Sequence, residues 1–96
     1  MTIETTAPFR RDLKRAEKRG LPTNELWTVV EMLKRGEELP PKYRDHALQG
    51  SFKGTRECHI RGDWLLVYRV EKNRLVLVLM RTGTHSDIFG NSRRED

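Results

Sequence analysis

The chain has 96 residues, of which 34% are charged, and its formal net charge is +5. A chain of this length forms one domain with a modest core, which excludes a deep, enclosed pocket. Any active site is therefore expected to be an open groove for a large substrate. The positive charge favours a polyanionic partner, and nucleic acid is favoured over a membrane because no long basic amphipathic helix is evident.

The sequence predicts a reducing environment and no membrane segment. Cys58 is the single cysteine, so an intramolecular disulfide is excluded. The first residues lack the apolar stretch of a secretory signal. The longest apolar run, 75–80, is too short to span a bilayer. We therefore expect a cytoplasmic protein without a membrane partner.

The first third of the chain begins with a short edge strand, predicted at residues 2–5 from a weak alternation of side chains. A helix is predicted over 8–19, where apolar residues repeat at helical spacing. Pro8 suits the first turn of this helix and Gly20 ends it.

A second helix is predicted over residues 24–35, capped by Thr23 or Asn24 and ended by Gly36. A long connection rich in proline and glycine follows, over residues 37–54. Connections of this length often carry function, so we expect this one to be more than a tether.

Three strands are predicted in the second half, over residues 55–60, 64–71 and 74–81. The turns between them are short enough to require antiparallel pairing. The last run is apolar on both faces, which predicts an interior strand under the helices. We therefore predict an α+β domain over 1–96, with two N-terminal helices packed on an antiparallel sheet and a frayed tail at 91–96.

Three histidines and one aspartate are candidates for chemistry. They are His46 in the long connection, His59 late in the first meander strand, Asp63 in the turn after it, and His85 after the last strand. Each residue taken alone is more often structural than functional, and His85 is expected to cap a short turn. Strand ends and adjoining loops can nevertheless bring such residues together from distant positions in the sequence.

Four chemistries could unite these residues. A zinc site of three histidines and a carboxylate lacks the usual paired-ligand spacing, so we expect no metal or other cofactor. A nucleophilic pair of Cys58 and His59 is disfavoured, because strand alternation places neighbours on opposite faces. Acid–base cleavage of RNA needs a base for the 2′-OH proton and an acid for the leaving 5′ oxygen. The fourth chemistry is RNA binding without catalysis.

Cations and aromatic rings suit both RNA hypotheses. A cation that steadies a phosphorane is expected among Arg81, Lys53 and Arg56. Rings for base stacking are Phe52, Trp64 and Phe89. The outer face of the first helix is basic and is expected to touch RNA phosphates. Its residues are Arg10, Arg11, Lys14, Arg15 and Lys18.

The pattern "DHALQGSFKGTRECHIRGDWLLVYRV…RTGTHSDIFG" resembles the YafQ branch of the RelE/ParE toxin superfamily. The similarity extends over nearly the whole chain and is most specific from Tyr43 to Phe89. The resemblance implies a RelE-like microbial ribonuclease fold, in agreement with the predicted elements. It also implies the toxin of a type II toxin–antitoxin pair, which cleaves mRNA in the ribosomal A site. The implied partners are an antitoxin protein, the ribosome and mRNA.

Residue by residue, the resemblance implies a catalytic cluster that works without a metal, formed by His46, His59, Asp63 and His85. Arg81 and Phe89 match family positions that hold the substrate. We expect His85 to be the general acid, and Asp63 or His59 to be the base. Gly62 stands where the family has proline, which loosens the turn that carries Asp63. The basic face of the first helix is expected to dock on ribosomal RNA.

Two other classes of function stay open at this point. One is a ribosome-binding or nucleic-acid-binding module without chemistry. The other is a gyrase poison of the ParE type, since that branch shares the fold. The histidine cluster favours the nuclease over both, because neither alternative needs several titrating side chains in one groove.

Overall fold

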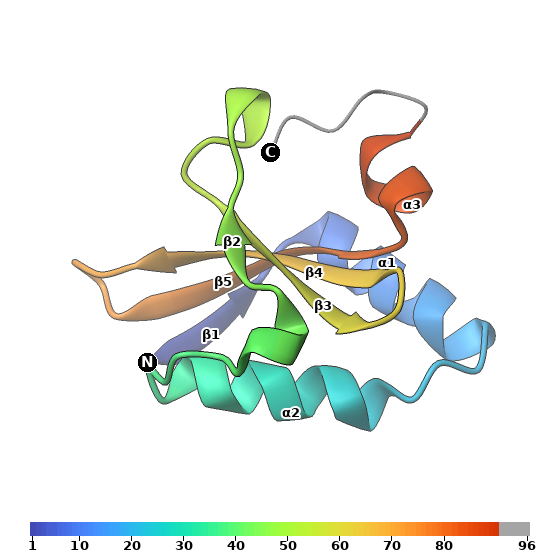
Figure 1. Ribbon diagram of the computed structural model, residues 1–96, viewed down its shortest axis with the longest axis horizontal. Helices are drawn as coiled ribbons and strands as arrows, with labels where there is room; N and C mark the ends of the chain where they lie inside the picture. The colour runs from blue at the N-terminus through green and yellow to red at the C-terminus, as the bar shows by residue number, and fades with distance from the viewer. Residues whose placement is uncertain (91–96) are drawn as a thin grey trace.

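A five-stranded sheet with the order β1-β5-β4-β3-β2 forms the centre of the computed structural model, which describes residues 1–90 (Figure 1). The tail predicted at 91–96 lies outside the described residues. The strands are β1 (Thr2–Thr5), β2 (His46–Ala47), β3 (Arg56–Arg61), β4 (Trp64–Glu71) and β5 (Val76–Gly83). The helices are α1 (Ala7–Lys18), α2 (Thr23–Lys34) and α3 (His85–Phe89), with 3-10 turns η1 (Pro41–Tyr43) and η2 (Gly50–Phe52). The predicted α+β class is confirmed.

The two N-terminal helices begin and end one residue before their predicted bounds. Thr6 caps α1, because its side-chain oxygen accepts a 3.1 Å hydrogen bond from the Phe9 backbone N–H. Helix α2 begins after Pro22 without a side-chain cap, so the prediction of a cap at Thr23 or Asn24 is wrong. None of the helices in the described part of the chain is long and apolar enough to cross a membrane.

The sheet is antiparallel except at one edge. β3, β4 and β5 pair antiparallel, and β5 lies in the interior, as predicted. β1 pairs with β5 in parallel, with Thr2 opposite Val76 and Thr5 opposite Leu79. The sheet predicted as antiparallel is antiparallel from β2 to β5, and this one edge is parallel. No short turn joins β1 to β5, and the chain between them contains the helices, so nothing forces these two strands to run in opposite directions.

Alternate residues of β4 divide the core between the two faces of the sheet. Leu66 and Tyr68 are buried with α1 and α2, in the larger of two hydrophobic clusters. Leu65 and Val67 face the other way and pack with Ile88 of α3. The second face of the sheet is therefore covered by α3 and η2, which leaves its edges open for a site.

The structure contains four elements that the pattern of the sequence did not predict. β2, η1 and η2 lie within the long connection, and α3 replaces the turn expected after β5. Thr84 caps α3, because its side-chain oxygen accepts from the Asp87 N–H while the Asp87 carboxylate accepts from the Thr84 N–H. The prediction that His85 caps this segment is wrong, and His85 is instead its first helical residue.

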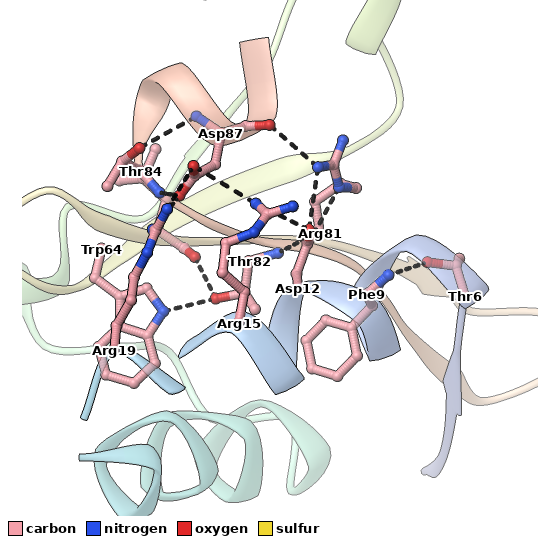
Figure 2. Close-up of polar contacts among 11 residues, drawn as sticks. Thr6, Phe9, Asp12, Arg15, Arg19, Trp64, Arg81, Thr82, Thr84 and Asp87 are labelled. Carbon is pink, nitrogen blue, oxygen red and sulfur yellow. Dashed lines mark hydrogen bonds and ion pairs between the residues drawn. The ribbon is translucent and has the colours of Figure 1, made fainter. Parts of the chain in front are cut away.

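A buried ion pair joins α1 to β5 (Figure 2). Asp12 is 3% exposed, and its carboxylate accepts from Arg81 Nε at 2.6 Å and Nη2 at 3.2 Å. The same carboxylate accepts from the Thr82 backbone N–H at 3.1 Å. Arg81 Nη2 also donates to the Asp87 carbonyl oxygen at 3.2 Å, which extends the connection to α3. These bonds satisfy a carboxylate that would otherwise be costly to bury.

We predict that Asp12→Ala lowers the free energy of unfolding by about 3 kcal/mol, because it leaves the partly buried Arg81 guanidinium without its carboxylate. Urea denaturation monitored by circular dichroism measures the change. The control is Glu31→Ala, which removes an ion pair with Arg35 in which both side chains are 52% exposed. That control should cost less than about 1 kcal/mol. Equal losses in the two variants would contradict the role assigned to Asp12.

Candidate active site

The face of the sheet opposite α1 and α2 brings the predicted histidines together. His46 comes from β2, His59 from β3 and His85 from the start of α3. His46 Nε2 lies 3.2 Å from Oε2 of Glu57, and His85 Nε2 lies 3.6 Å from Oε1 of the same carboxylate. The ring centroids of His59 and His85 are 6.1 Å apart. Asp63, in the turn between β3 and β4, hydrogen-bonds to His85.

Glu57 is the member of this cluster that sequence reasoning missed. Its side chain is fully buried, at 0% exposure, and its two oxygens face two different imidazoles. Glu57 and His59 are two residues apart in β3, so they share one face of the sheet. The sequence did contain a signal for Glu57, because it is a charged residue on the same strand face as the candidate His59. Buried carboxylates are kept where they are paired, and here the partners are the imidazoles.

The hydrogen bonds of His46 and His59 fix the position of one ring proton in each. His46 Nδ1 lies 2.8 Å from the Arg44 carbonyl oxygen, and His59 Nδ1 lies 3.1 Å from that of Gly62. A carbonyl oxygen can only accept, so Nδ1 carries the proton in both rings. The Nε2 of neutral His59 is then a lone-pair acceptor, which is the form that a general base requires.

His85 lies between two carboxylates. Its Nδ1–H donates to Asp63 Oδ1, and its Nε2 is directed at Glu57. When His85 is protonated, its Nδ1–H still donates to Asp63 and its Nε2 carries the second proton. The ring also stacks on Phe89, with centroids 6.2 Å apart and planes 29° apart. Its orientation is therefore set from three sides, which suits a group that delivers a proton in one direction.

The aromatic candidates divide into two kinds. Phe52 and Phe89 are partly buried and meet edge to face with centroids 4.9 Å apart, so they form a wall beside His85. Trp64 is only 4% exposed, and its Nε1–H donates to Thr82 Oγ1 at 2.8 Å. Its ring packs in the core and is not available for a base to stack on. The prediction of Trp64 as a substrate-binding ring is therefore wrong.

The predicted cations also differ in where they point and in what they bind. Arg56 points to the face opposite His59 because its position in β3 alternates with Glu57, and it pairs with Asp45 at 3.3 Å. The prediction that Arg56 joins the site is wrong. Lys53 follows η2 and is exposed. Arg81 is held by Asp12 through Nε and Nη2.

The basic face predicted on α1 is partly neutralised by the protein itself. Arg15 lies 3.5 Å from Asp87 and 3.8 Å from Asp12. Arg10 donates to the backbone and side chain of Thr5. The remaining three residues are exposed, and no carboxylate within residues 1–90 lies within ion-pair distance of them. They are Arg11, Lys14 and Lys18.

Two chemistries considered from the sequence find no support in this geometry. Cys58 is 0% exposed and packs in the core beneath the helices, and burial raises the pKa of its thiol far above neutrality. It is not a nucleophile in this state. Among the described side chains, no three from His, Cys, Asp and Glu are arranged to hold a metal ion.

Helix α3, which carries His85 and Phe89, is attached to α1 through Asp87 (Figure 2). The Asp87 carboxylate accepts from Arg19 Nη1 at 2.7 Å and from the Thr84 N–H at 2.9 Å. These bonds, above all that with Arg19, hold the pKa of Asp87 well below its usual range. Gly83 permits the close approach, because a Cβ there would lie 2.9 Å from Asp87 Cβ.

The structure thus defines a class: a small α+β domain with an open cluster of imidazoles and carboxylates on one face of its sheet. Comparison with known proteins identifies the family within this class. The family described as "Bacterial toxin of type II toxin-antitoxin system, YafQ" matches residues 1–90. The mRNA interferase toxin YafQ of Escherichia coli strain K12 is 39% identical over 89 residues, which is 92% of this chain and 95% of that protein. The chain belongs to the YafQ family of bacterial toxins.

Solved structures agree with this assignment. A metal-bound toxin from Helicobacter pylori superposes with a TM-score of 0.88 at 45% identity, over 93% of this chain and 99% of that one. The toxin in the Escherichia coli DinJ-YafQ complex superposes with a TM-score of 0.83 at 39% identity, over 92% of this chain and 97% of that one. The fold predicted from the family resemblance is confirmed.

We predict that Asp87 makes stability depend on pH in acid. The depressed pKa of Asp87 means that its contribution is complete above the unfolded value of about 3.9 and is lost as the pH falls below it. Asp87→Asn should therefore reduce the loss of unfolding free energy between pH 5 and 2.5 by about 1 kcal/mol, a figure discounted for the exposure of Arg19. Urea titrations at both pH values test this. Glu17→Gln, on the exposed side of α1, should leave the difference unchanged.

Proposed function

We propose that the chain is an mRNA interferase: a ribosome-dependent endoribonuclease that cleaves mRNA by acid–base catalysis, without a metal. The observation that carries the proposal is the pair of imidazoles, His59 and His85, whose rings lie 6.1 Å apart with their Nδ1 protons already committed. Membership of the YafQ family, and the activity named for the Escherichia coli relative, support it.

The reaction begins with His59. Its Nε2 lone pair takes the proton of the 2′-OH on the nucleotide 5′ of the cut, and the resulting alkoxide attacks the adjacent phosphorus. The P–O5′ bond then breaks as His85 gives its Nε2 proton to the leaving 5′ oxygen. The products are a 2′,3′-cyclic phosphate and a 5′-OH, so no water is consumed in this step. After this step His59 carries the extra proton and His85 has lost one, and proton exchange with solvent restores both starting forms.

The carboxylates position these two groups. Asp63 accepts the Nδ1 proton of His85, so Asp63 acts as the orienting residue and His59 is left as the base. Glu57 lies between His46 and His85 and is shielded from water, so its charge attracts both rings. The 3.6 Å between His85 Nε2 and Glu57 Oε1 is longer than a hydrogen bond, so Glu57 positions the ring without holding the proton that His85 delivers. His46 then acts through Glu57, on the side of the cluster away from Asp63.

The developing charge on the phosphorane needs a cation. The bonds of Arg81 to Asp12 and Asp87 use Nε and Nη2, so Nη1 is the atom that it has to offer a phosphate. Lys53 is the second candidate, because it follows the η2 turn that carries Phe52. A cation held by its own ion pair is preorganised, which is how electrostatic stabilisation of a transition state is most effective.

The partners follow from the same surfaces. Arg11, Lys14 and Lys18 on α1 dock on ribosomal RNA in the cytoplasm, and Arg10 and Arg15 add to the positive potential there. A cognate antitoxin neutralises the toxin by covering its basic surface with a segment that folds on binding. The complex of the Escherichia coli relative with DinJ supports an antitoxin partner. The paired imidazoles favour the nuclease over a gyrase poison.

We predict that His85→Gln lowers single-turnover cleavage of ribosome-bound mRNA by about 10² to 10⁴, the usual contribution of a positioned acid. A substrate with a 5′-thio leaving group needs no protonation and should restore the rate of this variant. The matched variant is His59→Gln, which should lose as much activity and gain nothing from the thio substrate. Rescue of His59→Gln instead of His85→Gln would reverse the two assignments.

We further predict that stripping the toxin of bound metal with EDTA leaves its cleavage rate unchanged, because both proton transfers are assigned to side chains. The EDTA is dialysed away before the toxin meets ribosomes in Mg²⁺ buffer, because chelation of Mg²⁺ would dissociate the ribosome, and single-turnover cleavage is then measured. The result matters because the similar Helicobacter pylori toxin is described as metal-bound. Loss of cleavage by the EDTA-treated toxin in Mg²⁺ buffer, restored by adding one transition-metal ion, would contradict the metal-independent mechanism.

A further inference from the structure

A basic groove runs from the histidine cluster toward η1. We call it the η1 groove and define it as the depression of about 440 Å³ whose lining includes Lys42, Arg44, Arg61 and His59. A second depression of about 390 Å³ continues from it and shares Lys42 and Arg61, with Tyr43 in its wall. The three cations come from η1, from the residue after it and from the end of β3.

The cations of the η1 groove are available to an outside partner. Lys42 and Arg44 are exposed, and no carboxylate of residues 1–90 lies within ion-pair distance of either. Arg61 pairs with Glu25 at 3.0 Å, but Arg61 is 60% exposed, so this pair is weak and exchanges easily with a phosphate. The groove also contains Asp63, whose Oδ1 already accepts from His85.

The backbone of the η1 groove has an unusual conformation at Arg44, where the groove meets the site. Arg44 has a left-handed backbone with φ of 50°, which is rare for a residue other than glycine. Its N–H donates to the Pro41 carbonyl at 3.0 Å, and its own carbonyl accepts from His46 Nδ1 at 2.8 Å. The residue that places a cation in the groove therefore also fixes the tautomer of a site histidine. Backbone strain of this kind persists where the surroundings enforce it, and it is concentrated at functional sites.

An aromatic ring accompanies the charges. Tyr43 is partly exposed and packs against the core, and Lys42 Nζ lies 5.1 Å from its ring centroid. Grooves that bind single-stranded nucleic acid combine cations along the backbone path with rings that contact bases. The η1 groove supplies the cations and opens directly beside His59, and the second depression that continues from it supplies the ring of Tyr43.

We propose that the η1 groove holds the mRNA strand on the 5′ side of the cut, with phosphates on Lys42, Arg44 and Arg61. The direction rests on the proposed function. His59, the base, contacts the nucleotide that carries the attacking 2′-OH, which is the nucleotide 5′ of the cut. His59 lines the groove, whereas His85, beside the departing 3′ fragment, lies across the cluster on α3.

The first experiment measures binding of a short RNA strand without ribosomes, made uncleavable by 2′-deoxy residues. The groove variant is the triple substitution Lys42→Gln, Arg44→Gln and Arg61→Gln. The control triple, Arg35→Gln, Lys72→Gln and Arg74→Gln, removes three exposed cations that do not line the groove and lowers the net charge of +5 by the same amount. The groove variant should reduce the salt slope of binding by about 0.7 per lost phosphate contact, or about 2 in all. The control should leave the slope near that of the wild type.

The second experiment tests direction on the ribosome with the wild-type chain. Uncleavable mRNA carries 4-thiouridine either 5′ or 3′ of the cut, and the crosslinked peptide is identified by mass spectrometry. Crosslinks from the 5′ probe should fall on the peptide that contains Lys42, Tyr43 and Arg44, and those from the 3′ probe should not. Three results overturn the proposal. They are equal salt slopes in the two triple variants, a wild-type chain that does not bind the RNA strand, and a crosslink from the 3′ probe to this peptide. If the salt slopes and the crosslinks come out as expected but the wild type does not cleave mRNA, the proposed function is wrong and the binding proposal stands.

Discussion

The buried pair of Asp12 and Arg81 is the interaction on which the remaining structure depends. One carboxylate accepts from the Arg81 guanidinium and from the Thr82 N–H, and the guanidinium continues to a carbonyl of α3. Helix α1 is thereby fixed relative to β5 and α3, which lie far from it in the sequence. The short helix α3 could not hold its place through its own backbone bonds, because an isolated helix of five residues is unstable in water. Its position, and with it that of His85, comes from α1 and β5.

A second buried carboxylate sets the geometry of the site itself. Glu57 is withdrawn from water, and its oxygens lie 3.2 Å and 3.6 Å from two imidazole nitrogens. Burial makes such a carboxylate expensive unless cations or donors surround it, so the two rings are held where they best satisfy it. Asp63 adds a more exposed acceptor on the opposite nitrogen of His85. Buried and exposed carboxylates thus orient imidazoles that remain accessible to an RNA strand.

The basic residues serve different purposes according to what lies beside them. Arg15 of α1 and Arg19, the residue after this helix, lie within ion-pair distance of Asp87. Part of the positive charge that composition assigns to RNA binding is therefore used to attach α3. Around η1, Lys42 and Arg44 have no such carboxylate within the described residues. Net charge therefore predicts the class of partner, whereas the ion pairs decide which surface meets it. Of the two proposed RNA surfaces, the basic face of α1 binds the ribosome and the η1 groove binds the mRNA strand.

The sequence by itself determined the first two helices, the meander and the candidate residues His46, His59, Asp63 and His85 that the fold then brings together. Helical and two-residue periods act locally, so the first two helices lie within one residue of their predicted bounds, and the motif "RTGTH" identifies His85. The tertiary structure alone decided what depends on contacts between distant segments. It made β1 parallel to β5, buried the Trp64 ring, turned Arg56 away from the site and placed Glu57 between two histidines. The reason is physical: period and capping are properties of neighbouring residues, whereas burial and ion pairing exist only after the chain has folded.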